Sequence, residues 1–282
     1  MNHAPPVRSP GGILFDLEGT LHIGDQAISG APEAIAHLAR LAIPTRFITN
    51  TTRYSRAELA TRLKAMGFSL EEDEIFTAPR SAAEWLRGRS LSRVMLCLPE
   101  STRSDFSGFD LVEDGAQAVV VGDLGREWTF DRLNAAFRAL LQGAVLVALQ
   151  KNRYWRTDDG LTLDAGPFVA ALEHAANTTA VLVGKPSPDF FLLAADSLGV
   201  AADDVLVAGD DVEADVGGAQ SAGMRGVLVR TGKFSYEALT RSGITPDEIH
   251  DSIKSLVDSL ASAPGISSGA ATAIKQGPEV LG

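Results

Sequence analysis

The feature that most constrains the fold of this chain is a repeated pattern of short apolar runs, each followed by a segment with helical spacing. Runs without polar residues are typical of strands that are buried on both faces, as in a parallel sheet. Strand and helix alternate at lengths that suit right-handed crossovers, so we predict an α/β fold with a doubly wound parallel sheet. The expected strands are 12–16 (GILFD), 44–50 (PTRFITN), 179–185 (TAVLVGK), 204–210 (DVLVAGD) and 226–231 (GVLVRT).

Several of the expected helices carry recognisable start signals. Ser55 and Glu58 have the spacing of a capping box, and Ser187 is followed by Pro188, which suits the first position of a helix. Thr245, Pro246 and Glu248 form a similar signature before the last periodic segment. The expected helices are 31–42, 55–68, 187–200 and 245–261.

The middle of the chain has strands and helices of its own. Asp159-Gly160 lies between two strand-like runs and predicts a hairpin. This predicts a smaller α/β domain inserted between two halves of one sheet. The expected division is 1–77 for the first half of the main domain, 78–178 for the insertion and 179–262 for the second half. Residues 263–282 lack periodicity, and we expect them to be disordered.

Composition excludes several classes of function. The formal charge of -11 and the pI of about 4.9 argue against binding to nucleic acid or to an anionic membrane. The first residues lack the apolar core of a signal peptide, and no apolar run reaches the roughly 18 residues of a membrane span. The single cysteine, Cys97, excludes an internal disulfide framework and suits a buried strand better than a nucleophile. We therefore expect a soluble cytoplasmic protein.

The polar residues at the ends of the apolar runs indicate the site. Ligands bind beyond the carboxyl ends of strands in open parallel sheets. Carboxylates at such ends suit a magnesium ion, and a lysine can neutralise phosphate oxygens, so the set predicts phosphoryl transfer. Taken singly, each residue also has a structural explanation: a turn cap, a loop, a surface lysine or an acidic helix start. The candidate residues are Asp16, Thr49, Asn50, Lys185, Asp210, Asp211 and Asp215.

The order of these residues resembles motifs one to four of the haloacid-dehalogenase-like hydrolases. The four motifs are Asp16-Leu-Glu18-Gly-Thr20, Thr49-Asn50, Lys185-Pro186 and Gly209-Asp210-Asp211 with Asp215. The insertion resembles the second type of cap domain, as found in the NagD-like, 4-nitrophenyl-phosphatase branch. Within that branch the chain most resembles the subgroup that contains phospholysine phosphohistidine inorganic pyrophosphate phosphatase. The resemblance spans the chain apart from the first ten residues and the tail.

The resemblance implies a Rossmann-like core and a magnesium-dependent phosphatase of small phosphorylated compounds. Asp16 would be the nucleophile and would carry an aspartyl-phosphate, while Lys185 would offset the charge between two anions. Thr49 and Asn50 would bind the phosphoryl group. The metal would be held by Asp16, the main-chain carbonyl of Glu18 and Asp210, with Asp215 and Asp211 orienting its water shell. The resemblance also implies a homodimer formed through the cap.

Glu18 departs from the family pattern. The usual residue is an aspartate that acts as general acid and base, and serine often replaces it in the subgroup that this chain most resembles. Glutamate keeps the carboxyl group but places it about 1.5 Å farther out, and a misplacement near 1 Å can cost on the order of a hundredfold in rate. Glu18 therefore leaves open a phosphate-binding protein of low activity. A phosphotransferase on the same fold also stays open, because it differs only in whether water or another hydroxyl accepts the phosphoryl group. Dehalogenation is disfavoured, because it would not need the metal ligands.

The inserted segment is where substrate choice is expected. Arg153, Tyr154, Trp155 and Arg156 either reach toward the main site, or Trp155 packs inside the cap while the arginines meet solvent. His22 and Arg53 follow motif residues directly, and for both we expect a structural role rather than substrate contact. The physiological substrate does not follow from these residues.

Overall fold

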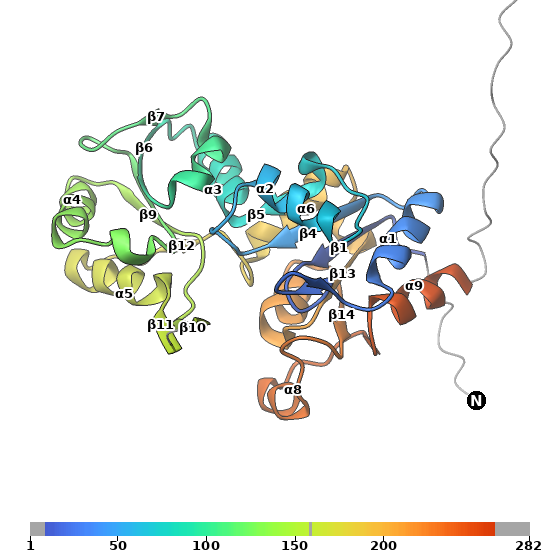
Figure 1. Cartoon of the computed structure of the whole chain (residues 1–282). Coiled ribbons are helices and arrows are strands. Elements are labelled where there is room, and N and C mark those ends of the chain that lie inside the picture. The colour runs from blue at the N-terminus through green and yellow to red at the C-terminus, as the bar shows by residue number, and fades with distance from the viewer. Residues whose placement is uncertain (1–8, 158–159, 263–282) are drawn as a thin grey trace, which may run out of the picture.

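The main lobe of the molecule is built on a six-stranded sheet in which all recorded pairs are parallel (Figure 1). The structure, a computed structural model, describes residues 9–157 and 160–262. In spatial order, the strands are β15 (Glu248–His250), β14 (Arg225–Val229), β13 (Val205–Gly209), β1 (Gly12–Asp16), β4 (Thr45–Thr49) and β5 (Ile75–Thr77).

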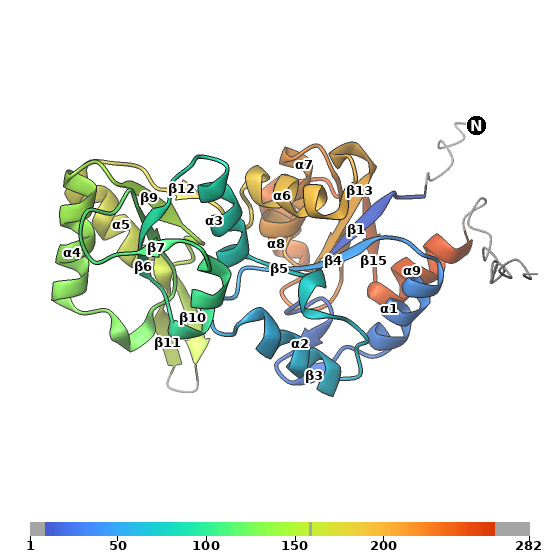
Figure 2. The same ribbon diagram turned by 90° about the horizontal axis from the view of Figure 1, so that it is seen from above.

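Helices cover both faces of this sheet, as Figure 2 shows. Successive residues of a strand point to opposite faces. Accordingly, Ile13 and Phe15 pack with α1, α2 and α9, whereas Leu14 packs with α6 and α7. This confirms the expected doubly wound sheet and explains why its central strands, β13 and β1 as far as Asp16, are apolar. These helices are α1 (Ala31–Arg40), α2 (Arg56–Ala65), α9 (Ile253–Ser262), α6 (Pro188–Leu198) and α7 (Gly218–Ser221).

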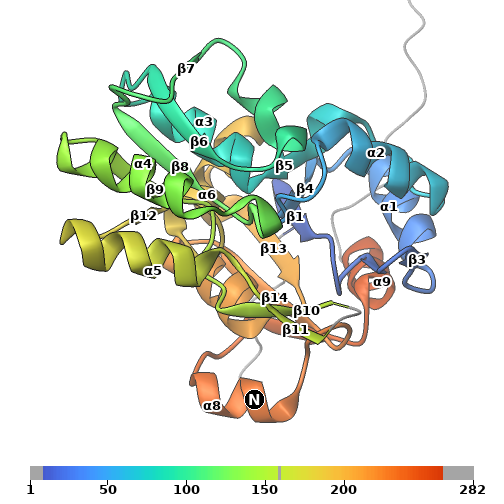
Figure 3. The same cartoon turned by 60° about the vertical axis from the view of Figure 1, so that its left-hand side comes forward.

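The smaller lobe is inserted between β5 and β13 and has its own five-stranded parallel sheet. Helix α3 (Ala78–Arg87) packs on one face of it, and α4 (Phe130–Leu141) and α5 (Ala165–Ala176) pack on the other (Figure 3). In spatial order, its strands are β12 (Val181–Leu182), β9 (Val145–Ala148), β8 (Ala118–Val121), β6 (Arg93–Cys97) and β7 (Asp110–Leu111).

Two short hairpins and one further helix complete the architecture. Strands β2 (His22–Ile23) and β3 (Gln26–Ala27) form a hairpin directly after β1. Strands β10 (Tyr154–Thr157) and β11 (Gly160–Leu163) pair antiparallel in the smaller lobe, as expected around residue 159, which itself lies outside the described residues. Helix α8 (Tyr236–Ser242) follows β14 in the main lobe.

Two elements differ from the sequence-based expectation. The run 179–185 was expected in the main sheet, but its strand β12 pairs with β9 of the smaller sheet. An apolar run shows that a strand is buried but not which sheet it joins. The helix expected over 245–261 begins only at Ile253, because 248–250 form β15 at the edge of the main sheet, paired with β14. That pairing is long-range, and the local helix-start signal could not reveal it.

The domain boundaries at 77/78 and 178/179 stay a proposal. Strand β12 lies after the second boundary but pairs with β9 of the smaller sheet. The expected tail, 263–282, lies outside the described residues. Within residues 9–157 and 160–262, none of the helices combines the length and apolar character that a membrane span requires.

Candidate active site

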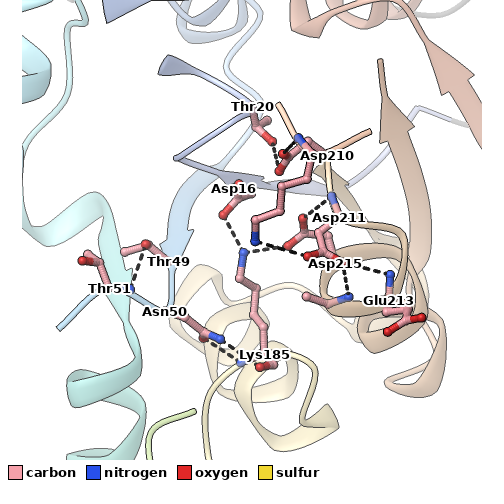
Figure 4. Close-up of polar contacts among 12 residues, drawn as sticks. Asp16, Thr20, Thr49, Asn50, Thr51, Lys185, Asp210, Asp211, Glu213 and Asp215 are labelled. Atoms are coloured by element: carbon pink, nitrogen blue, oxygen red, sulfur yellow. Dashed lines mark hydrogen bonds and ion pairs between the residues drawn. The ribbon is translucent and has the colours of Figure 1, made fainter. Parts of the chain in front are cut away.

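Three of the expected site residues lie where neighbouring strands of the main sheet end. Asp16 is the last residue of β1, Thr49 is the last residue of β4, and Asp210 directly follows β13. Because β13, β1 and β4 are adjacent and parallel, the three side chains converge at one edge of the sheet (Figure 4). All three residues are buried.

Lys185 reaches the same point by a different route. It stands in the segment that returns from β12 to the main lobe, rather than at the end of a main-sheet strand. Its Nζ donates to Asp16 Oδ1 at 2.5 Å and to Asp215 Oδ1 at 2.6 Å, and the whole side chain is buried. The lysine therefore links the strand end of β1 to the acidic turn after β13.

Asn50 holds this lysine in place. Its Oδ1 accepts from the Lys185 main-chain N–H, and its Nδ2 donates to the Lys185 carbonyl, both at 2.8 Å. Thr49 Oγ1 accepts from the Thr51 N–H at 3.1 Å, which shapes the loop after β4. In this arrangement Asn50 acts on the lysine backbone, in addition to the phosphoryl contact expected from its motif.

The turn after β13 fixes Asp215. Asp211 Oδ1 accepts from the N–H groups of Glu213 and Ala214, and thereby caps the helical turn Val212–Gly217 that carries Asp215. The Asp211 N–H also donates to Asp215 Oδ2 at 3.1 Å. Burial raises the pKa of Asp211, but these N–H donors and Lys233 outweigh it, so the pKa lies below its usual value and the group is ionised.

Asp16, Asp210 and Asp215 form the candidate metal site. Each offers a carboxylate oxygen, these oxygens lie within 4.8 Å of one another, and all three residues are buried. Oxygen ligands of this kind suit Mg²⁺. The three carboxylates outnumber Lys185, the ammonium group that contacts two of them. A divalent cation would offset the remaining negative charge, so the donor set fits magnesium.

The pKa values of this cluster reflect the same imbalance. Burial raises the pKa of Asp16; Lys185 opposes this and Asp210 adds to it. Burial likewise raises the pKa of Asp210, and raises that of Asp215 to about 6. Burial lowers the pKa of Lys185, but Asp16 and Asp215 outweigh that effect and keep its amine charged. A bound cation would stabilise the ionised form of these carboxylates and so lower their pKa values.

Glu18 differs from these acids in its surroundings. Its side chain is 61 % exposed, and Oε1 accepts from the Gly24 N–H at the tip of the β2–β3 hairpin. Oε2 lies 3.3 Å from Nδ1 of the buried His22, whose Nδ1 also lies 2.9 Å from the Gly24 carbonyl oxygen. His22 therefore orients Glu18 and the hairpin, which is a structural role.

The other residues that the sequence singled out lie outside the acidic cluster. Arg53, Arg153 and Tyr154 are exposed, and the side chains of Trp155 and Arg156 lie outside the described structure. The Arg53 carbonyl accepts from Ser101 Oγ of the smaller lobe at 3.3 Å. Cys97 is fully buried in β6, and burial raises the pKa of its thiol to about 12, as suits a strand residue rather than a nucleophile.

The sequence analysis missed two residues of the site, Thr231 and Lys233, and gave no role to Thr20 of the first motif. Thr20 Oγ1 donates to Asp210 Oδ1 at 3.4 Å, and the Lys233 N–H donates to Asp210 Oδ2 at 2.6 Å. Thr231 Oγ1 donates to the Gly19 carbonyl at 2.6 Å. Thr231 and Lys233 follow the end of β14, so the strand-end reasoning that predicts Asp16 and Asp210 applies to them as well.

A cavity of about 210 Å³ adjoins this side of the site. It touches Asp210 and Asp211 and is bounded by Lys233, Phe234 and Arg241. It leaves open space beside Asp210, one of the candidate metal ligands, on the side of β14 and α8.

Comparison with known proteins identifies the family. Residues 13–111 match the model of the haloacid dehalogenase-like hydrolases, and residues 182–256 match a second model, described as HAD-hydrolase-like. Bovine "Haloacid dehalogenase-like hydrolase domain-containing protein 2" is 44% identical over 83% of this chain and 88% of its own length. The chain belongs to the haloacid dehalogenase-like hydrolases.

Further relatives place this family member within a branch. Human phospholysine phosphohistidine inorganic pyrophosphate phosphatase is 40% identical over 89% of this chain and 92% of its own length. The p-nitrophenyl phosphatase from Archaeoglobus fulgidus matches with a TM-score of 0.84 and 30% identity, covering 89% of this chain and 100% of that one. NagD from E. coli shares the fold, with a TM-score of 0.81, 21% identity, and coverage of 88% and 98%. The NagD-like branch and the expected enzyme class, a phosphatase, are thereby confirmed.

Proposed function

We propose that this family member is a magnesium-dependent phosphatase that hydrolyses small phosphorylated compounds through an aspartyl-phosphate on Asp16. The carrying observation is the buried contact of Lys185 with both Asp16 and Asp215, inside the three-carboxylate cluster. The names of the relatives support phosphate esters, phosphoramidates and pyrophosphate as the substrate class.

The reaction would proceed in two displacements at phosphorus. An Asp16 oxygen forms a bond to phosphorus while the bond to the leaving group breaks, and the leaving group takes the electron pair and a proton. Water then attacks the aspartyl-phosphate, which releases inorganic phosphate and restores the carboxylate. An aspartate is ionised at neutral pH when its charge is compensated, so it needs no base to activate it.

The surrounding residues would make this attack between anions feasible. The Lys185 ammonium contacts Asp16 at 2.5 Å and would neutralise charge shared between the carboxylate and the phosphate. Thr49 and Asn50 would contact the phosphoryl group, and Asn50 would also keep Lys185 in position. Glu18 would transfer protons to the leaving group and from water.

Magnesium would be held by Asp16, Asp210 and the main-chain carbonyl of Glu18, with Asp215 orienting its water ligands. When bound, it would neutralise the oxygens of the transferring group. The donor chemistry of the buried cluster supports this assignment. The net charge of -11 argues against nucleic-acid or anionic membrane partners. We also propose a cytoplasmic location for the enzyme.

Phosphate release from p-nitrophenyl phosphate and from pyrophosphate, with magnesium chloride or with EDTA, tests this proposal. We expect release only with magnesium, and Asp16→Asn should reduce kcat by at least about 10³-fold, because the nucleophile is lost. Asp203→Asn, which alters an exposed aspartate of the main lobe, is the matched control and should keep activity. Bound phosphate without release from either substrate would instead indicate a binding protein, and transfer to an added alcohol without hydrolysis would indicate a phosphotransferase.

A further inference from the structure

A segment after β14, outside the four motifs, is hydrogen-bonded to the Asp210 carboxylate. Lys233 donates its main-chain N–H to Asp210 Oδ2 at 2.6 Å, while Thr20 donates to the other oxygen, Oδ1, at 3.4 Å. Two different loops therefore fix the rotation of this one carboxylate. A carboxylate with both oxygens bonded keeps its orientation when a metal binds to it.

The same segment also fastens the loop after β1. Thr231 Oγ1 donates to the Gly19 carbonyl at 2.6 Å. Gly19 lies between Glu18, whose main-chain carbonyl is an expected metal ligand, and Thr20, which bonds to Asp210. Residues 231–233 thus connect the two loops that would supply the metal ligands from β1 and β13.

The backbone of residues 231–233 packs directly against the β1 loop and Asp210. Gly232 has a φ of +53°, and a Cβ there would lie 2.1 Å from Asp210 Oδ2 and 2.5 Å from the Gly19 Cα. Gly19 has a φ of +89°, and a Cβ there would also lie 2.1 Å from Asp210 Oδ2. Neither position has room for a side chain. The two glycines let the segment, the β1 loop and the aspartate approach one another directly.

We propose that Thr231, Gly232 and the Lys233 N–H form a positioning segment that sets the geometry of the magnesium ligands. The hydroxyl of Thr231 would hold the β1 loop, and the amide of Lys233 would orient Asp210. None of the three would touch the metal or the substrate. This inference rests on the proposed magnesium site.

Titration calorimetry with magnesium chloride on the full chain tests the role of the hydroxyl. Thr231→Val removes the hydroxyl and keeps the branched shape, and we expect the dissociation constant for magnesium to rise by about tenfold or more. Thr231→Ser keeps the donor and should restore most of the affinity. Thr61→Val is the matched control, because it deletes a hydroxyl that bonds to the Ala57 carbonyl at 2.9 Å on the exposed side of α2, and it should leave affinity unchanged.

Steady-state kinetics gives an independent readout. For Thr231→Val we expect a higher magnesium concentration for half-maximal activity and a kcat that recovers at saturating magnesium. A lower kcat at every magnesium concentration, with the dissociation constant unchanged, would overturn the positioning role. If the unaltered protein binds no magnesium, the proposed function itself fails. If it binds magnesium and Thr231→Val binds equally well, only the present inference fails.

Hydrogen exchange of the unaltered protein keeps the test independent of whether any variant folds. The Lys233 amide is bonded to Asp210, so magnesium that locks this aspartate should slow its exchange, whereas the Thr61 amide on α2 should not respond. Exchange of the Lys233 amide that is insensitive to magnesium, in protein shown by calorimetry to bind it, would contradict the proposal.

Discussion

Glu18 raises the sharpest question at the scale of single residues. It replaces the family's usual second aspartate, and its carboxylate accepts from Gly24 on the β2–β3 hairpin instead of lying in the buried acidic cluster. The hairpin and His22 hold it in one orientation, 3.3 Å from the imidazole. A general acid matters most when the leaving group is a poor one, because such a group needs a proton as it departs.

Glu18→Ala should therefore reduce kcat/KM for an alkyl phosphate by about 10²–10⁴-fold, and much less for p-nitrophenyl phosphate or pyrophosphate. The nitrophenolate and phosphate leaving groups are stable without full protonation. Steady-state kinetics on the three substrates measures the difference, with Glu33→Ala, at an exposed residue of α1, as the control. Equal losses on all three substrates would reject the acid role. If Glu18→Asp raises turnover, the glutamate is a partial defect or a specificity device.

At the scale of elements, α2 begins directly after the capping residue that the local sequence pattern predicts. Ser55 Oγ accepts from the Glu58 N–H, and the Glu58 carboxylate accepts from the Ser55 N–H, so the predicted capping box is present. The bonds from Ser55 lower the pKa of Glu58 below its ordinary 4.5. A lowered pKa means that the stabilisation is fully present above pH 4.5 and is lost as the pH falls through the lowered value.

Ser55→Ala should destabilise the protein by about 1 kcal/mol at neutral pH, and this difference should shrink as the pH falls below 4.5. Urea denaturation at a series of pH values measures the free energy of unfolding. Ser187→Ala is a matched control, because Ser187 precedes α6 but its side chain makes no capping hydrogen bond. The capping account is wrong if both substitutions cost the same or if the Ser55 effect does not depend on pH.

The elements also show where sequence reasoning reaches its limit. Asp16 and Asp210 could be predicted because a strand end is a local feature, and parallel packing brings such ends together. Lys185 was predicted at the site, but for the wrong structural reason, since its preceding strand belongs to the smaller sheet. The bonds of Thr231 and Lys233 to the β1 and β13 loops join residues far apart in the chain, and no local spacing predicts them.

At the scale of the whole molecule, the smaller lobe presents apolar side chains to solvent. Phe130 is 78% exposed and Leu141 is 63% exposed, at the two ends of α4. Eleven residues apart, they lie about three turns from each other and on the same side of the helix. Their helix covers the face of the smaller sheet opposite to α3 (Figure 3). Two large apolar side chains exposed on one side of a helix offer an apolar face that a second copy of the chain could cover.

We therefore propose a homodimer that forms through α4 of the smaller lobe, as the family resemblance implies. The double variant Phe130→Ser and Leu141→Ser should raise the dimer dissociation constant by at least about thirtyfold, because central apolar contacts dominate such interfaces. Sedimentation velocity over a range of concentrations measures this.

Leu192→Ser, at a residue of α6 in the main lobe that is 43% exposed, should leave the dimer intact. The acidic cluster and Lys185 come from one chain, so the monomeric variant should still bind magnesium. A wild-type chain that is monomeric at every concentration, or a double variant that still dimerises, would show that this surface is not the interface.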